Sequence, residues 1–173
     1  MIEELKALIT KDENLFFFEG EKQFISIFTQ KRFDISDYEI LSRVQREYLK
    51  KSLSKLNFNW VTGSILASKE SENRIIFPKY KNIDFFPYKE ILTYKNTDII
   101  VISPTQLAYY IIQNQADAGT ILKEMIYKLP INIVKLKRLF PQSQELLLEL
   151  EKEQAFALKN SSLRFKSEID TTF

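Results

Sequence analysis

The stretch TDIIVISPTQLAYYIIQNQADAGTILKEMIYKLPINIVKLKRLF, residues 97–140, has the densest apolar content of the chain and clear start and stop signals. Its first part, residues 98–102, is a short Ile- and Val-rich run, which is typical of a strand covered on both faces. Ser103 at an N-cap, Pro104 at the first helical position and Gln106 at the capping-box position then predict a helix. The stretch therefore predicts a buried strand that leads directly into helices.

Helical spacing of apolar residues, interrupted by prolines, continues to the end of this stretch and beyond it. We expect four helices, over residues 104–114, 117–129, 131–140 and 142–159. Residues 160–173 lack this pattern and predict a mobile tail, so residues 1–159 are expected to form one compact domain. The C-terminal half of the domain is thus predicted to be helical.

The N-terminal half predicts a mixture of helices and strands. We expect a helix over 2–10, a strand over 15–19 and a helix over 21–30. Ser36 and Glu39 form a capping box that predicts the start of a further helix, which runs to about residue 56. A hairpin of 58–68 with 73–79 and a loop with edge-strand character over 79–96 should follow. The segment 21–30 is ambiguous, because Phe24, Ser26 and Phe28 also fit strand alternation. The fold class that follows is α+β, with a small mixed or antiparallel sheet packed against several helices.

Composition excludes several common chemistries. The chain has no Cys and no His, which removes thiol nucleophiles, imidazole bases, disulfides and Cys/His zinc sites. It has three glycines, and none forms a phosphate-binding loop. Carboxylate pairs such as Glu19 with Glu21, or Asp34 with Asp37, are the only acid–base candidates, and they assemble no catalytic site. We therefore expect a non-enzymatic protein without a cofactor or metal.

Location and partners follow from similarly simple observations. The lack of cysteine suits a reducing compartment, and neither a signal peptide nor an apolar run of membrane-spanning length is visible, so we expect a cytoplasmic protein with no membrane contact. The net charge of +2 is nearly balanced, but basic residues cluster over 43–55 and 123–138, and acidic residues over 145–153. Any electrostatic partner would therefore meet a local patch.

The last predicted helix carries the leading functional hypothesis. Its apolar residues spread round more than one face, which is typical of a helix buried in its own domain or against a partner. We expect an adaptor or accessory subunit that binds a protein partner, or a second copy of itself, through its C-terminal helices. The candidate interface residues are Leu146, Leu147, Leu150, Phe156 and Leu158.

The alternative hypothesis is a nucleic-acid-binding or regulatory protein. Aromatic and basic residues interleave over 77–95, the mixture with which single-stranded nucleic acid binders stack bases and neutralise phosphates. Two consecutive basic helices follow over 123–138. The candidate residues are Lys79, Tyr80, Lys81, Phe86, Tyr88, Lys89, Lys123, Lys128, Lys135, Lys137 and Arg138.

The order of a short strand, a capped apolar helix and small trailing helices over residues 99–140 resembles the C-terminal part of AbiEi-type antitoxins. No diagnostic residue of that family is matched, so the resemblance implies no activity, partner or site residue for this chain.

Overall fold

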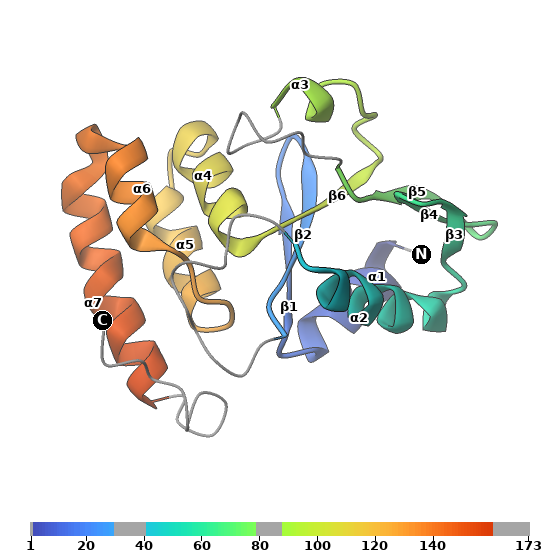
Figure 1. Cartoon of the computed structure of the whole chain (residues 1–173), viewed down its shortest axis with the longest axis horizontal. Helices are drawn as coiled ribbons and strands as arrows, with labels where there is room; N and C mark the ends of the chain where they lie inside the picture. Colours follow the sequence, from blue (N-terminus) through green and yellow to red (C-terminus); the bar gives the residue numbers. More distant parts are fainter. Residues whose placement is uncertain (1, 30–40, 79–87, 161–173) are drawn as a thin grey trace.

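The computed structural model describes residues 2–29, 41–78 and 88–160, in which six strands form one mixed sheet of order β1-β2-β6-β5-β4-β3 (Figure 1). The strands are β1 (Leu15–Glu19), β2 (Gln23–Ile27), β3 (Asn59–Thr62), β4 (Ile65–Ser68), β5 (Ser71–Ile76) and β6 (Ile99–Ile102). Strand β6 runs parallel to both β2 and β5, and the other neighbours are antiparallel. The predicted α+β class with a mixed sheet is confirmed.

Helices lie on both faces of this sheet. They are α1 (Ile2–Lys11), α2 (Arg43–Leu53), α3 (Tyr88–Ile91), α4 (Pro104–Asn114), α5 (Ala118–Ile126), α6 (Ile133–Leu139) and α7 (Gln144–Asn160). Helices α1 and α2 share one hydrophobic cluster with the sheet, and α4 to α7 share another on the opposite face. Helix α4 packs against the sheet and α7 lies farthest from it (Figure 1). The C-terminal half is helical, as the sequence predicts.

Strand β6 and the turn into α4 are the best-predicted part of the fold. All four residues of β6 are buried, and they alternate between the two clusters, with Ile100 and Ile102 on one side and Ile99 and Val101 on the other. Ser103 caps α4, and its hydroxyl and the Gln106 side chain form the expected capping box. The strand-to-helix turn is therefore fixed by local chemistry.

Buried polar side chains fasten the C-terminal helices together. The Gln154 amide donates to the Ile131 carbonyl at 2.9 Å and accepts from the Ile131 N–H at 2.8 Å. The hydroxyl of Thr105 accepts from the Asn132 N–H at 2.9 Å. Because each bond satisfies a backbone group that is shielded from water, these bonds hold α7 and the start of α6 in place.

The prediction of a helix over residues 21–30 is wrong, because residues 23–27 form strand β2. Phe24 pairs with Ile100 of β6, and four of the five residues of the strand are buried. A strand covered on both faces loses its polar alternation, and Phe24, Ile25 and Phe28 then fit a helical spacing by coincidence. Tertiary cover therefore overrides the apparent helical period.

The segment 41–78 also differs from expectation. Helix α2 begins at Arg43, where Ser42 is its N-cap, and not at Ser36, which lies outside the described residues. Residues 59–76 form three antiparallel strands instead of two, because the chain makes a first hairpin that turns at Gly63 and Ser64 before the hairpin of β4 with β5. Residues 79–87 and the predicted tail over 161–173 are likewise outside the described residues.

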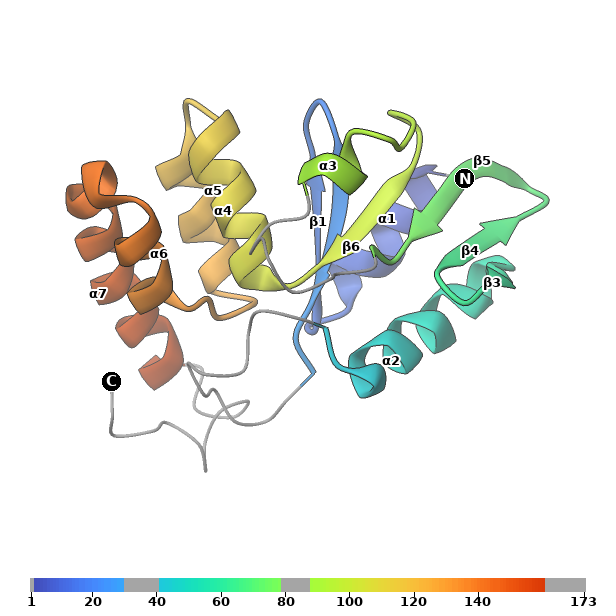
Figure 2. The same cartoon turned by 45° about the horizontal axis from the view of Figure 1, so that its top comes forward.

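Strands β3, β4 and β5, which we call the wing, differ from the rest of the sheet. Helices α4 to α7 lie over β1, β2 and β6, and the wing extends beyond them (Figures 1 and 2). Leu66 and Ile75 pack towards α2 and are buried. On the other face, Val61 keeps 66% of its surface exposed. The described helices therefore cover one face of the wing well, and they do not cover the other face in the same way.

No helix in the described ranges is both long enough and apolar enough to cross a membrane.

Candidate functional site

The leucines predicted to form an interface mostly belong to the domain's own core. Leu147, Leu150 and Leu158 are buried, and Leu146 packs partly against the same cluster as Leu147. Phe156 is 58% exposed. Helix α7 is apolar on several sides because it packs against both α5 and α6. Four of the five candidates thus pack within the chain itself.

The basic residues predicted on α5 and α6 are largely engaged within the domain. Lys123 pairs with Glu149 of α7, and Lys137 pairs with Glu151 at 2.8 Å. The ammonium group of Lys128, just beyond α5, donates to the Ile9 and Thr10 carbonyls at 3.1 and 3.2 Å. It thereby neutralises the C-terminal end of α1. Lys135 is half-buried and Arg138 is exposed. These helices present few uncommitted cations to a polyanion.

The basic and aromatic stretch 77–95 is only partly described. Lys79, Tyr80, Lys81 and Phe86 lie outside the described residues. Tyr88 is half-buried against Tyr109, with ring centroids 5.9 Å apart, and its hydroxyl bonds to Gln113. Burial raises the pKa of Tyr88 to about 12. Lys89 is exposed. The described end of this stretch is therefore tied to α4.

The carboxylate candidates come no closer to an active site. Glu19 forms an ion pair with Lys6, and Asp34 and Asp37 lie outside the described residues. Within the described ranges, no group of three or more acidic residues is placed to hold a metal ion.

Strand β3 offers a different kind of site. It is an edge strand, because β4 is its only neighbour among the described strands. Among the described residues, no strand pairs with the N–H and C=O groups on its outer side, which is the kind of edge that can pair with another chain. Natural edge strands are commonly protected by charged residues or proline, and the sequence NWVT of β3 has neither. The edge is thus open, although β3 is short and carries a register shift near Thr62.

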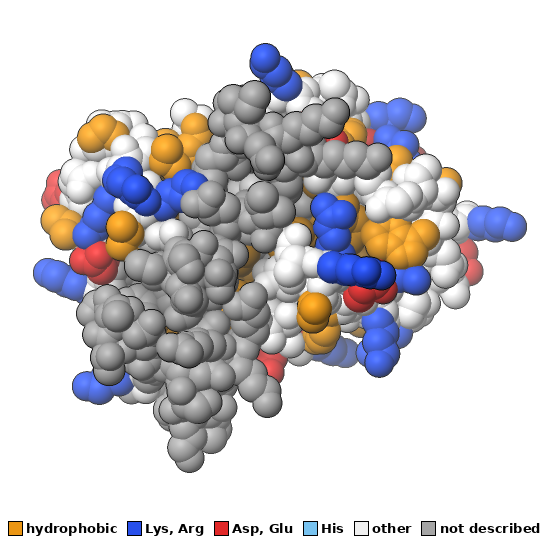
Figure 3. Space-filling model, in the orientation of Figure 1, with side chains coloured by type: hydrophobic (Ala, Val, Ile, Leu, Met, Phe, Trp, Pro, Cys, Tyr) orange, Lys and Arg blue, Asp and Glu red, His pale blue; other side chains and the backbone are white. Residues whose placement is uncertain are grey.

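Trp60 of β3, the only tryptophan of the chain, lies beside a pocket of about 410 Å³. The pocket is lined by Arg43, Arg46 and Glu47 of α2 and by Trp60, Thr62 and Gly63 of the first hairpin. The Trp60 ring packs against buried Phe77, with centroids 5.2 Å apart, and the Arg46 guanidinium lies 5.5 Å from the same Phe77 ring. Hydrophobic and basic side chains accordingly lie side by side over α2 and the wing (Figure 3).

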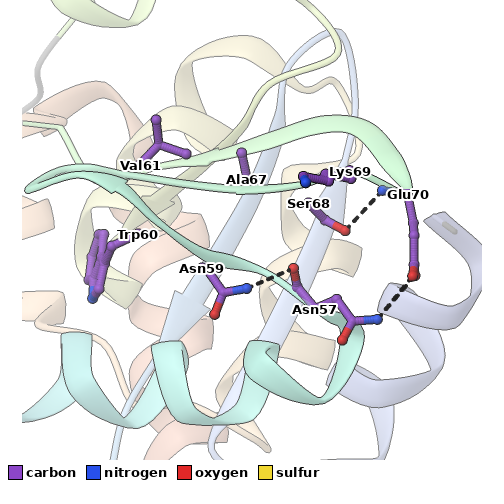
Figure 4. A pocket seen from close by; sticks show the side chains of 8 residues that line it. All are labelled: Asn57, Asn59, Trp60, Val61, Ala67, Ser68, Lys69 and Glu70. Atoms are coloured by element: carbon purple, nitrogen blue, oxygen red, sulfur yellow. Dashed lines mark hydrogen bonds between the residues drawn. The ribbon is translucent and has the colours of Figure 1, made fainter.

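A second pocket, of about 440 Å³, opens along the same strand. Figure 4 shows the residues that line it, with Val61 and Ala67 on one side of the hairpin. Its far end is braced where the Asn57 amide donates to the Glu70 carboxylate at 3.1 Å. Asn57 has a φ of 63°, a left-handed conformation that asparagine tolerates better than most residues. Pockets therefore flank β3 towards both of its ends.

The first turn of α2 has an unusual charge pattern. A helix N-terminus favours acidic side chains, and α1 and α7 both have glutamate in their first turn. The first turn of α2 has no acidic residue, and Arg43 is its first residue. Arg46 follows one turn later, and its buried Nε has no hydrogen-bond partner among the described residues. The positive end of this helix is thus reinforced by two arginines.

No protein-family model matches the chain, and no curated protein or solved structure is significantly similar to it. Fold and site together define the chain as an α+β protein with a mixed sheet, in which no described strand covers the outer edge of β3.

Sequence reasoning missed the site around Trp60. The basic cluster over 43–55 was visible, and the positions of Arg43 and Arg46 off the apolar stripe indicated a solvent-facing surface. Nothing local indicated that α2 would lie beside β3, because this contact depends on how the hairpin folds back. A lone tryptophan near a basic helix was the available signal.

Proposed function

We propose that the chain is a non-enzymatic interaction protein that binds an extended segment of a partner protein along β3. The observation that carries this proposal is the open β3 edge, uncharged and flanked by two pockets. The lack of cysteine suits a reducing compartment such as the cytoplasm, where we place the protein.

Strand addition fits this surface physically. A segment laid beside β3 would satisfy the outward N–H and C=O groups with its own backbone, and every second side chain would point to the same side of the sheet. Because β3 has four residues, the added ladder would be short. Affinity and specificity would therefore come largely from side chains that enter the flanking pockets.

This proposal moves the interaction surface away from α7. Three of the five interface candidates there are buried, whereas Val61 and the outer edge of β3 are exposed. The adaptor or accessory role expected from the sequence remains the proposed class of function, with a different binding element.

Nucleic-acid binding is the competing proposal. It is supported by Trp60 beside Arg43 and Arg46, since aromatic rings stack on bases and arginine contacts phosphate. It is weakened by the acidic Glu47 in the same pocket and by the internal bonds of Lys123, Lys128 and Lys137. Nucleic-acid binding would weaken steeply with added salt because neutralised phosphates release counterions.

The test is a selection of peptides followed by chemical editing of their backbone. Random peptides displayed on phage are selected on the immobilised full-length chain, and the enriched sequences are synthesised with a fluorescent label. N-methylation of every second amide removes the donors on one edge of the peptide and leaves the other edge intact. We expect one set of methylated positions to abolish binding and the alternate set to leave it nearly unchanged.

Two results would contradict the proposal. Equal effects of both methylation sets would mean that the peptide does not bind as a strand. Light scattering that shows a dimer, with the amides of β3 protected from exchange in that dimer, would mean that a second copy occupies the edge. The same peptides tested against labelled single-stranded DNA and RNA in competition separate the nucleic-acid alternative.

A further inference from the structure

We infer that the segment bound along β3 carries an aspartate or glutamate whose carboxylate enters the pocket between Arg43 and Arg46. This inference rests on the proposed function and specifies the chemistry of the partner. Both arginines line the pocket of about 410 Å³ beside Trp60, and this volume is large enough for an acidic side chain together with part of the adjoining backbone.

The two arginines are set apart from four other cations of the domain by the lack of an ion pair and from most others by their place at a pocket. Lys6, Arg74, Lys123 and Lys137 pair with carboxylates. Among the described residues, by contrast, neither Arg43 nor Arg46 lies in an ion pair. Neither positive charge is therefore neutralised by a carboxylate in the described structure, although the Arg46 guanidinium lies over the Phe77 ring.

Arg46 is the more informative of the two. Its Nε is buried and has no hydrogen-bond partner, and its guanidinium is held near the Phe77 ring. Stacking of this kind restricts the side chain, so less freedom is lost when it binds an anion. A carboxylate can accept two parallel hydrogen bonds from a guanidinium. An acidic side chain is thus a ligand that the restrained guanidinium of Arg46 could bind.

The start of α2 favours the same ligand. Basic residues at a helix N-terminus are electrostatically unfavourable, and α2 places Arg43 at its first position without an acidic neighbour in that turn. A bound carboxylate would complement both the helix end and the arginines. The basic start of α2 departs from the usual preference of helix N-termini for acidic residues, and it does so beside a pocket. Departures of this kind are expected at functional sites.

A peptide carboxylate fits this pocket better than a nucleic-acid backbone. Glu47 also lines the pocket, so two cations face one anion, which suits a single bound carboxylate better than a run of phosphates. The open edge of β3 adds backbone donors and acceptors that match a polypeptide strand. The pocket and the edge are contiguous through Trp60 and Thr62. One extended acidic segment can therefore occupy both.

The experiment uses the peptides enriched on the full-length chain. We expect Asp or Glu at one fixed position, and replacement of that residue by Asn or Gln should weaken binding about 10- to 100-fold, the range for hydrogen bonds to a charged group. Arg43→Glu in the protein should weaken binding to a similar degree. Combining Arg43→Glu with Lys at the acidic position of the peptide should restore part of the lost affinity.

A matched control is Arg138→Glu on α6, which reverses an exposed arginine on the opposite side of the molecule and should leave binding unchanged. Arg46→Gln tests the second arginine without placing a new charge next to Phe77. Circular dichroism of each variant verifies that it is folded. Arg46→Gln should act mainly through the dissociation rate because it removes a contact in the formed complex, whereas the charge reversal Arg43→Glu should also slow association of an acidic peptide.

Failure of this inference is distinct from failure of the proposed function. If peptides bind as strands in the methylation test but show no acidic position, and Arg43→Glu has no more effect than Arg138→Glu, the inference is overturned and strand binding stands. If no peptide binds as a strand, the proposed function fails. If single-stranded DNA or RNA displaces the peptide with a steep salt dependence, the ligand is nucleic acid and the inference is overturned.

Discussion

One sheet contains two regions that differ in how deeply they are buried. They are the covered half, which consists of β1, β2 and β6, and the wing, which consists of β3 to β5. Strand β6 is buried on both faces, whereas β3 is exposed at its edge and on one face. Most side chains of the covered half pack in the hydrophobic core. The wing has an edge that no described strand covers and a half-buried tryptophan, and beside it α2 carries two arginines that form no ion pair among the described residues. The contrast indicates that stability is concentrated in the covered half, and the wing is the region to which we assign the proposed binding surface.

The largest expected effect on the free energy of unfolding comes from creating a cavity in the core of the covered half. Phe24 of β2 is fully buried and packs against the rings of Phe18 and Tyr110 at 6.3 and 4.6 Å. We expect Phe24→Ala to lower the free energy of unfolding by about 3–5 kcal/mol. The same substitution at exposed Phe156 should cost under about 1 kcal/mol. Urea denaturation of both variants measures the difference, and equal losses would contradict the assigned core.

The part of the fold that sequence predicted is the part with local signals. The capping box of Ser103 and Gln106 predicts the start of α4, and the apolar run over 98–102 predicts β6. Both signals depend only on residues that are neighbours in the sequence. The same local logic failed at 21–30, where cover on both faces removes the alternation that would have identified β2. Local chemistry was therefore a reliable guide, and tertiary cover was the source of the error.

The candidate site was beyond sequence reasoning for a related reason. Residues 77–95 and 123–138 were chosen because cations and aromatic rings are close together in the sequence. Three of those cations bond within the domain, with partners on α7 and at the end of α1. Arg43 and Trp60 are far apart in the sequence, and a pocket between them exists only after the first hairpin folds beside α2.

The seam between the two regions should give an intermediate effect. Arg74 of β5 holds the buried Asp98, just before β6, through two bonds, Nε to Oδ1 at 3.0 Å and Nη2 to Oδ2 at 2.8 Å. Arg74→Met leaves that carboxylate with the Lys95 N–H as its remaining bond among those described. We expect a loss of about 2 kcal/mol, reduced from the value for a fully buried pair because Arg74 is partly exposed.

Hydrogen exchange shows where that loss falls. If Arg74 and Asp98 anchor the wing, Arg74→Met should speed exchange of the β4 and β5 amides more than that of β2 and β6 amides. Lys69→Met, at an exposed position of the turn between β4 and β5, is the matched control and should change neither stability nor exchange appreciably. Uniform acceleration over the whole sheet would mean that the wing does not open separately.

The smallest expected effect compares one substitution in the two regions. Val101 of β6 is fully buried, and Val61 of β3 is 66% exposed. Val→Thr keeps the branched shape and adds a hydroxyl, which costs about 1–3 kcal/mol when it is buried without a partner. We therefore expect that loss for Val101→Thr and a change within about 0.5 kcal/mol for Val61→Thr, measured by urea denaturation. If Val61→Thr costs as much as Val101→Thr, the outer face of β3 is covered in solution, and the contrast between the two regions fails at this position.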